Sequence, residues 1–266
     1  MMKDQIISLL PPGHPWGELL QCFDCVESTN TLAKAMAASG SPAGTVLIAD
    51  SQTGGRGRRG RSFHSPSGTG IYMSAILRPG CAPTELMHLT CAVAVAMCDA
   101  VEKAAGFRPG IKWTNDLVFG KRKLAGILTE LGLSPSGTVD YAVIGIGVNC
   151  TQESGDFPEE IREIAGSVSM AAGGPVDRAA LAAAMVEALA EMDQTLLSGR
   201  QTVLDRYRRD CITLGQDIAL IRGDEIRHGK ALDIDHEGAL IVRFAPGHVE
   251  TVSSGEVSVR GMYGYL

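Results

Sequence analysis

The chain has 266 residues, of which 45% are hydrophobic, and its 24 basic and 30 acidic side chains give a formal net charge of −6. That length is enough for one large domain or two unequal ones. The acidic balance argues against a dedicated nucleic-acid-binding domain, because such domains usually carry a broad basic face. Apolar stretches such as 91–97 are far shorter than a membrane span, and the N-terminus lacks the pattern of a secretory signal.

The seven cysteines are scattered without regular spacing. This arrangement suits a reducing compartment better than a disulfide framework, so we expect a cytoplasmic protein. Cys22 and Cys25 form a Cys-x-x-Cys pair, but no second pair or histidine cluster in the sequence completes a zinc site. We therefore interpret them as two small, half-buried thiols.

Predicted helices and strands alternate along most of the chain. Residues 1–21 contain three prolines and little periodicity, so we expect a short lead-in there. The predicted helices are 29–39, with Ser28 or Thr29 as N-cap, then 84–105, 177–197 and 202–210, and the predicted strands are 45–50, 71–77, 110–113, 117–119, 124–131 and 141–148. Two long helices on one side of a run of strands that look antiparallel indicate an α+β layer.

After Leu214 the pattern changes to short strands separated by turn residues. These predicted strands are 217–222, 225–234, 239–244, 248–252 and 256–260. Five short strands in succession predict a small β-barrel. We therefore expect two domains, 1–213 and 214–266.

The most informative segment is 55–61, which reads Gly-Arg-Gly-Arg-Arg-Gly-Arg. Guanidinium groups bind carboxylate and phosphate oxygens, and glycines let the backbone approach a ligand closely. Four like charges cannot pack in a core, so we expect a surface loop that stays mobile until an anion orders it. Either a nucleic-acid backbone or a pair of small anions, such as a triphosphate and a carboxylate, fits this chemistry. The acidic chain without a second basic run favours small anions.

Two polar segments accompany the loop. Ser28, Thr29 and Asn30 stand at a predicted helix start, where they are either ordinary capping residues or ligands for a polar head group. Residues 112–116, Lys-Trp-Thr-Asn-Asp, place a cation, an amide and a carboxylate at a strand end. They form either a plain turn or a site that contacts phosphates, a purine edge or a magnesium ion.

Two glycine-containing strands complete the set. Lys123 is the last charge before an apolar run, so we expect its ammonium group to point toward the sheet interior, with Gly126 leaving space for a ligand. Residues 144–149 read Ile-Gly-Ile-Gly-Val-Asn and lack the third glycine of a dinucleotide fingerprint, because Cys150 occupies that position. They are either a bulge in a buried strand or a floor under a flat ligand, with Asn149 bonding a phosphate or base.

Together these segments closely resemble the biotin–protein ligases, or biotin–[acetyl-CoA-carboxylase] ligases, in the short form without an N-terminal DNA-binding domain. The matching residues are Ser-Thr-Asn at 28–30, Gln52, the arginine segment at 55–61, Ser-Pro-x-Gly at 65–68, Lys-Trp-x-Asn-Asp at 112–116, Lys-Leu-Ala-Gly-Ile-Leu at 123–128, Gly-Ile-Gly-x-Asn at 145–149 and Gly-Glu-Val-Ser at 255–258. The resemblance covers nearly the whole chain from about Val26. It implies a mixed-sheet α+β catalytic domain of the class II synthetase type, followed by a small SH3-like β-barrel.

The resemblance also implies a two-step reaction. Biotin and MgATP give biotinyl-5′-AMP and pyrophosphate, and a lysine of a biotin carboxyl carrier protein or domain then takes the biotinyl group. ATP and Mg²⁺ are therefore the expected cofactors, biotin is a substrate, and the magnesium ligands are left open. Because the first step brings two anions together, cations must hold both, and we expect Arg58 and Lys123 to bridge them.

Site residues follow from the same resemblance, position by position. The expected biotin-binding residues are Ser28, Thr29, Asn30, Gln52, Gly55, Arg56, Gly57, Arg58, Tyr72, Lys123, Gly126 and Gly145. The expected ATP-binding residues are Arg58, Arg61, Phe63, Lys112, Asn115, Lys123 and Asn149. The expected catalytic residues are Lys123, Arg58 and Asp116. Asp116 would orient or deprotonate the acceptor lysine, whose unperturbed pKa is about 10.4.

The sequence departs from the family pattern at two places. Phe63 stands where a tryptophan is common; it can still stack on adenine, with a smaller face. Only 25 residues precede Val26, too few for a helix-turn-helix domain, so we expect a ligase that neither represses transcription nor binds DNA or membranes. A homodimer through exposed sheet edges stays open. We also expect the loop from about Thr53 to His64 to order when biotin or the adenylate binds.

Three other interpretations compete with this one. A lipoate–protein ligase would share the activating lysine, although the arginine segment points to biotin. An arginine-glycine RNA or DNA binder would show salt-sensitive oligonucleotide binding without ATP dependence. A non-catalytic carrier-binding protein would keep its function when Lys123 is replaced.

Overall fold

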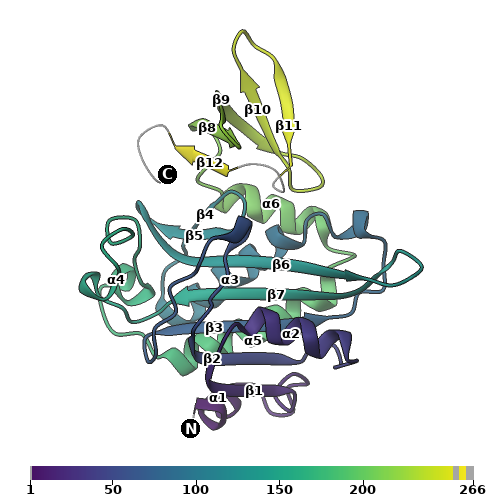
Figure 1. Cartoon of the computed structure of the whole chain (residues 1–266), viewed down its shortest axis with the longest axis vertical. Coiled ribbons are helices and arrows are strands. Elements are labelled where there is room, and N and C mark those ends of the chain that lie inside the picture. The colour runs from purple at the N-terminus through teal and green to yellow at the C-terminus, as the bar shows by residue number, and fades with distance from the viewer. Residues whose placement is uncertain (1, 254–257, 262–266) are drawn as a thin grey trace.

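Two β-sheets organise the computed structural model, which describes residues 2–253 and 258–261 (Figure 1). The large sheet has the order β1-β2-β3-β7-β6-β5-β4, with β1 parallel to β2 and every other pair antiparallel. Its strands are β1 (Leu20–Val26), β2 (Val46–Gln52), β3 (Gly70–Leu77), β4 (Gly110–Lys112), β5 (Asp116–Phe119), β6 (Arg122–Leu133) and β7 (Val139–Asn149). The α+β fold class expected from the sequence is confirmed.

Helices cover both faces of the large sheet. They are α1 (Met2–Leu9), α2 (Thr29–Ala38), α3 (Leu89–Ala105), α4 (Val168–Ala172), α5 (Arg178–Thr195) and α6 (Arg200–Asp210). The long helices α3 and α5 pack together on one face, and the short helix α2 packs on β2, β3 and β7. The chain therefore has a helix–sheet–helix cross-section, in which α2 leaves part of its face uncovered.

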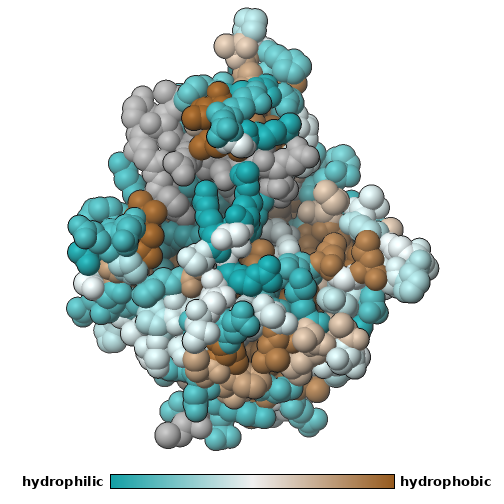
Figure 2. All heavy atoms as spheres, viewed as in Figure 1, coloured by the Kyte–Doolittle hydropathy of each residue, from teal (hydrophilic) through white to brown (hydrophobic). Residues whose placement is uncertain are grey.

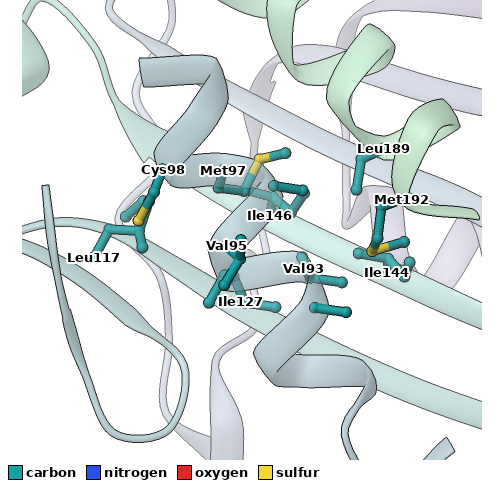
Figure 3. Close-up of a cluster of buried hydrophobic side chains, with 14 of the residues drawn as sticks. Val93, Val95, Met97, Cys98, Leu117, Ile127, Ile144, Ile146, Leu189 and Met192 are labelled. Atoms are coloured by element: carbon teal, nitrogen blue, oxygen red, sulfur yellow. The ribbon is translucent and has the colours of Figure 1, made fainter. Parts of the chain in front are cut away.

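Strand alternation divides the core into two clusters. Successive side chains of a strand point to opposite faces, so Ile144 of β7 joins the large cluster with α3 and α5, whereas Val143 joins a small cluster with Ala33 and Ala37 of α2. The large cluster contains Val93, Val95 and Met97 of α3, Ile127 of β6, Ile144 and Ile146 of β7, and Leu189 and Met192 of α5 (Figure 3). This apolar layer packs helices α3 and α5 against the face of the sheet opposite to α2.

One stretch of the described residues, Pro83–Ala105, is long and apolar enough to cross a membrane by length and composition. However, 72% of its most apolar window is buried inside this molecule. The stretch contains α3, the helix at the centre of the large core cluster. The apolar character of α3 is thus explained by its contacts within the fold.

The expected lead-in over 1–21 is wrong. Residues 2–9 form α1, whose Ile6 is fully buried against the core, and β1 follows as an edge strand beside β2. Eight residues before two prolines are too few to display helical periodicity, and β1 buries little more than Leu20. Neither element carries the hydrophobic pattern by which the longer elements were found.

The predicted helix 84–105 is also different at its start. Residues Pro83–Leu86 form a 3₁₀ turn, and α3 begins only at Leu89. The Glu85 carboxylate accepts a hydrogen bond from the Ala82 N–H at 2.9 Å, which favours the tight turn. The predicted stop is confirmed, since Gly106 ends α3 in the left-handed conformation.

The second sheet is small and wholly antiparallel. Its strands are β8 (Asp217–Arg222), β9 (Glu225–Ile234), β10 (Leu240–Phe244), β11 (Val249–Val252) and β12 (Ser258–Gly261), in the order β11-β10-β9-β8-β12. It contacts the large domain where the Trp113 indole donates to the Gly238 carbonyl at 3.0 Å. Residues 255–257 of the predicted barrel signature lie outside the described residues, and the boundary at 213/214 stays a prediction.

Candidate active site

Three glycines on two neighbouring strands make a hollow on the α2 face of the large sheet. Gly145 and Gly147 of β7 share a face because they are two residues apart. The register places Gly126 of β6 directly beside Gly147, and Ser74 of β3 beside Gly145. Because these glycines have no side chains of their own, other groups approach the sheet closely there: the Asn30 amide lies over Gly145 and the Phe63 ring over Gly147.

The arginine segment and the N-terminus of α2 close over this floor and form a cavity of about 470 Å³, its open mouth included. The predicted site residues that line it are Ser28, Thr29, Asn30, Gln52, Arg56, Gly57, Arg58, Phe63, Asn115, Lys123, Gly126 and Gly145. Ile127, Leu128, Ile146 and Gly147 complete the lining. The segments that were weak signals singly therefore meet in one place.

One end of the cavity is a buried hydrogen-bond network, which we call the polar end (Ser28, Thr29, Asn30, Gln52 and Ser74). The Thr29 amide and hydroxyl groups donate to Gln52 Oε1 at 2.9 and 3.2 Å. The Ser74 hydroxyl oxygen lies 2.9 Å from both Thr29 Oγ1 and Asn30 Oδ1. Ser28 caps α2 as predicted, accepting from the Thr31 N–H. These partners fix the side chains before any ligand arrives.

The opposite end carries charge, and we call it the cationic end (Arg58, Asn115, Asp116 and Lys123). Arg58 Nη1 donates to Asn115 Oδ1 at 2.9 Å, and Lys123 Nζ lies 2.6 Å from Asp116 Oδ1. Burial lowers the pKa of the Arg58 guanidinium, and the Asp116 charge opposes that shift. Arginine nevertheless stays protonated at neutral pH, so two cations face this end of the cavity.

The arginine segment forms a compact hairpin between β2 and β3. Its two sides are joined where the Phe63 N–H donates to the Gly55 carbonyl at 2.9 Å and the Gly57 N–H donates to the Arg61 carbonyl at 2.7 Å. A β-carbon at Gly55 would lie 2.4 Å from the Phe63 carbonyl oxygen. The first glycine of the segment therefore permits the loop to pack on itself, and Gly55 does not line the cavity.

Phe63 lies inside the cavity. A β-carbon on Gly147 would be 2.6 Å from its ring, and one on Gly126 would be 3.6 Å away. Its ring meets Tyr72 edge to face, with centroids 6.4 Å apart. In this conformation Phe63 covers part of the floor that the sequence assigned to the flat ligand, so a ligand there must displace the ring.

Five further predicted residues lie outside the cavity lining. The Tyr72 hydroxyl donates to the Pro66 carbonyl at 2.9 Å, and Asn149 Nδ2 donates to the Gly166 carbonyl at 3.0 Å, so both groups already have backbone partners. Lys112 is only 7% exposed, whereas Arg61 is exposed. Asp116 is paired with Lys123, which does line the cavity.

Sequence reasoning missed two polar residues beside the cavity, Ser74 and Glu130. Ser74 is fully buried and hydrogen-bonds within the polar end, to Thr29 and Asn30. Glu130 Oε2 accepts from Asn30 Nδ2 at 2.8 Å, and Lys34 and Arg56 pair with the same carboxylate. Side chains on one face of a strand recur every second residue, so Gly126, Leu128 and Glu130 share a face of β6; this spacing could have identified Glu130 from the sequence.

On the face viewed in Figure 2, hydrophilic residues gather in the middle and apolar ones form scattered patches.

Comparisons with known proteins identify the family. The profile of the Biotin/lipoate A/B protein ligase family matches residues 22–149, and that of the Biotin protein ligase C terminal domain matches residues 213–260. The chain is 33% identical over 263 residues to a biotin–[acetyl-CoA-carboxylase] ligase of Mycobacterium tuberculosis, covering 96% of this chain and 93% of that protein. It is 34% identical over 244 residues to the bifunctional ligase/repressor BirA of Bacillus subtilis, covering 91% of this chain and 74% of that one.

A solved structure agrees with these relatives. A biotin protein ligase from Aquifex aeolicus, in complex with biotin and ATP, superposes with a TM-score of 0.76 at 28% identity, covering 91% of this chain and 98% of that one. The two matched profiles occur in the order expected from the sequence, catalytic part first. This chain therefore belongs to the biotin protein ligase family.

Proposed function

We propose that this chain activates biotin with ATP and transfers the biotinyl group to a lysine of a biotin carboxyl carrier protein. The observation that carries the proposal is one cavity with a buried hydrogen-bonding end and a cationic end. A heterocyclic acid that must react through its carboxylate needs both. The names of the Mycobacterium and Aquifex relatives, which refer to biotin and to acetyl-CoA carboxylase, support the choice of substrate and acceptor.

At the polar end, we assign Ser28, Thr29, Asn30 and Gln52 to the ureido ring of biotin. These groups are held by one another and by Ser74, so they offer hydrogen bonds in fixed directions. The bicycle would lie over Gly126, next to the Asn30 amide, which itself covers Gly145. Phe63 would then leave the floor for the nucleotide side and stack on adenine.

At the cationic end, we assign the first reaction step. A biotin carboxylate oxygen bonds to the α-phosphorus of ATP, and pyrophosphate leaves with the electron pair of the broken P–O bond. Arg58 and Lys123 each bridge the carboxylate and the α-phosphate, which offsets the repulsion of the two anions. The neutral Asn115 amide that accepts from Arg58 is a weaker partner than a phosphate oxygen. Arg61, Lys112 and Asn149 stay predicted nucleotide contacts.

Magnesium is proposed to enter with ATP as part of the substrate. Among the described residues, 2–253 and 258–261, no three His, Cys, Asp or Glu residues lie close enough together to hold a metal ion. Mg²⁺ is commonly held by substrate phosphates, waters and one or two carboxylates, which fits a site of this composition. The ion would neutralise phosphate charge; the residues of the chain position the carboxylate and the α-phosphate.

The second step transfers the biotinyl group. The acceptor lysine nitrogen bonds to the acyl carbon of biotinyl-5′-AMP, AMP leaves with the bonding electrons, and the amine loses a proton. We assign that proton to Asp116. Its Oδ1 lies 2.6 Å from Lys123 Nζ at the same end of the cavity, so the proton can be taken where the acyl phosphate is held.

We further propose that residues 2–26 serve the fold and do not bind DNA. Helix α1 packs on α5 and β1, and β1 extends the catalytic sheet. Because the Bacillus subtilis relative is named a ligase/repressor, the test is a gel-shift assay with DNA upstream of biotin-synthesis genes, with biotin and ATP present. A specific shift would overturn this part of the proposal.

Two further proposals concern the setting of the enzyme. All seven cysteines are free thiols, which supports a reducing, cytoplasmic location. Strands β1 and β4 are the edges of the seven-stranded sheet, and β4 already bonds to residues 211 and 212, so a homodimer could form by pairing of β1. Light scattering of the purified protein with and without biotin measures this directly.

The decisive experiment is ATP–pyrophosphate exchange with biotin, with lipoate and with neither acid. Exchange with biotin alone supports adenylate formation, and exchange with lipoate alone would assign the chain to the lipoate ligases. Lys123→Ala should lower the exchange rate by about 10²–10³-fold, whereas Lys121→Ala, in the exposed β5–β6 turn, should leave it nearly unchanged. Transfer to a carrier domain, followed by mass spectrometry, tests the second step.

A further inference from the structure

Glu130 is the acidic residue that joins three parts of the cavity wall. It stands on β6 on the same face as Gly126, and its side chain is 18% exposed. Its carboxylate accepts from Asn30 Nδ2 at 2.8 Å, pairs with Lys34 of α2 at 2.8 Å, and lies 3.6 Å from Arg56 Nη1. From its place on the sheet, it therefore contacts both helix α2 and the arginine segment.

The first consequence is a fixed orientation of the Asn30 amide. An ionised carboxylate can only accept hydrogen bonds, so the NH₂ group of Asn30 must face Glu130. The amide oxygen then points to Ser74, 2.9 Å away, directly above Gly145. Although burial opposes it, hydrogen bonds from Lys34 and Asn30 and the charge of Arg56 lower the pKa of Glu130, so the group is ionised at neutral pH.

The amide keeps hydrogen-bonding capacity for a ligand. Glu130 takes one of the two Asn30 N–H donors, and Ser74 takes one of the two oxygen lone pairs. The amide therefore keeps a second N–H donor and a second oxygen lone pair, and Asn30 lines the cavity. A cyclic urea offers the complementary pair, an N–H beside a carbonyl group. The dithiolane ring of lipoate offers neither.

The second consequence is an attachment for the arginine segment. Arg56 is tied to Glu130, and Arg58 is tied to Asn115. The segment is thus held on both sides of Gly57, one attachment at each end of the cavity. The Arg56 side chain is 47% exposed, so this pair contributes little to stability. Its effect is to restrict where the backbone of the segment can lie.

We propose that Glu130 is a positioning residue that sets the specificity of the site for a cyclic urea, by orienting Asn30 and attaching Arg56. The inference rests on the proposed function, because it concerns the same ligand. Loss of the Glu130 carboxylate should weaken biotin binding and leave ATP binding and the chemical step nearly unchanged. It should also reduce the preference for biotin over lipoate.

The variants that test this are Glu130→Ala and Glu130→Gln, assayed by pyrophosphate exchange. Removing a charged hydrogen-bond partner of a buried amide should raise the KM for biotin about tenfold or more in Glu130→Ala. The KM for ATP and kcat should stay within about twofold. Glu130→Gln keeps an acceptor for Asn30 but loses the charge that holds Lys34 and Arg56, so it should recover part of the loss. A purely structural role would not produce this split.

Glu187→Gln is the matched control. Glu187 of α5 is also paired with a lysine, Lys103 of α3 at 2.6 Å, but it lies on the face of the sheet opposite to the cavity. A cycle with Asn30→Ala adds a second readout: if Glu130 acts through Asn30, the double variant loses much less than the product of the two single losses. The inference would be overturned if Glu130→Ala had the same KM for biotin as the control, or if its kcat fell while that KM stayed unchanged. It would also be overturned if the losses of the two single variants multiplied in the double variant. If Glu130→Ala does not fold, Glu130→Gln decides on the same criteria.

The wild-type enzyme separates this inference from the proposed function. Biotin-dependent exchange by the wild type, with no effect of the Glu130 variants on the KM for biotin, would reject only the positioning role. Absence of biotin-dependent exchange in the wild type would reject the proposed function itself.

Discussion

The two ends of the cavity differ in how firmly their side chains are held. At the polar end, Thr29, Asn30 and Ser74 are at most 4% exposed and hydrogen-bond to one another and to their neighbours. At the cationic end, the groups assigned to the chemistry are partly exposed and are paired with Asn115 and Asp116. One end is fixed before the ligand binds, while the other must exchange partners during the reaction. Recognition is thus placed on rigid strands and a helix start, and charge stabilisation on longer, more mobile side chains.

The largest expected effect is at the cationic end. Replacing Lys123 or Arg58 by alanine should lower kcat for adenylate formation by about 10²–10³-fold, because the substituted group stabilises charge that develops in the transition state. The KM for biotin should change much less, since the polar end is intact. Rates of biotin-dependent pyrophosphate exchange measure this, with Lys121→Ala as control. A rise in KM alone would show that the two ends do not divide recognition from chemistry.

A second prediction compares how readily Asn30 and Phe63 can move when an alanine replaces the glycine beneath each of them. A β-carbon at Gly145 would lie 2.2 Å from Asn30 Oδ1, which is held by Ser74, and one at Gly147 would lie 2.6 Å from the Phe63 ring, which belongs to the loop. Gly145→Ala should therefore cost about 1–3 kcal/mol of unfolding free energy, as overpacking usually does. Gly147→Ala should cost less, because the ring can move away. Urea unfolding of both variants gives the comparison, and equal losses would contradict it.

The sequence predicted most of the fold because its signals are local. Strands β8 and β9 match the predicted ranges residue for residue, since Gly223 and alternating side chains mark them. Helix α1 and strand β1 were missed because a short element that buries few residues carries no period to detect. Their positions depend on packing against α5 and β2, elements that lie far away in the sequence.

The cavity was predictable where its residues form contiguous motifs. Ser28, Arg58 and Lys123 lie in such segments and meet as expected. Glu130 and Ser74 stand in no motif; only the register of β6 and β3 against β7 brings them to the site. The position of Phe63 over Gly147 depends on how the arginine segment folds back, which local pattern does not specify.

The difference in rigidity should also be visible in limited proteolysis. The arginine segment is attached to the cavity wall through Arg56, which is half exposed, and Arg58, and its two sides are joined by hairpin contacts, so we expect it to open in the free enzyme more often than the sheet does. Biotin or the adenylate should add contacts and slow tryptic cleavage within 56–61 several-fold. Cleavage after Arg222, the exposed last residue of β8, is the internal control. Equal rates with and without biotin would reject ordering of the loop.

The smallest expected effect concerns the charge of Glu130, which accepts a hydrogen bond from Asn30 of the polar end. The pKa of Glu130 is lowered in the folded protein: burial opposes the shift, but hydrogen bonds from Lys34 and Asn30 outweigh it. A lowered carboxyl pKa stabilises the fold fully above the ordinary value of about 4.3 and less as the pH falls through the folded pKa.

The free-energy difference between wild type and Glu130→Gln should therefore be constant from pH 8 to about pH 5 and shrink on further acidification. Urea unfolding at several pH values, with Glu187→Gln beside it, measures the trend. A difference that grows toward acid would mean that the carboxylate is strained at the polar end. The fixed network would then exist in spite of Glu130, and Ser74 and Gln52 alone would have to hold Asn30 and Thr29 in place.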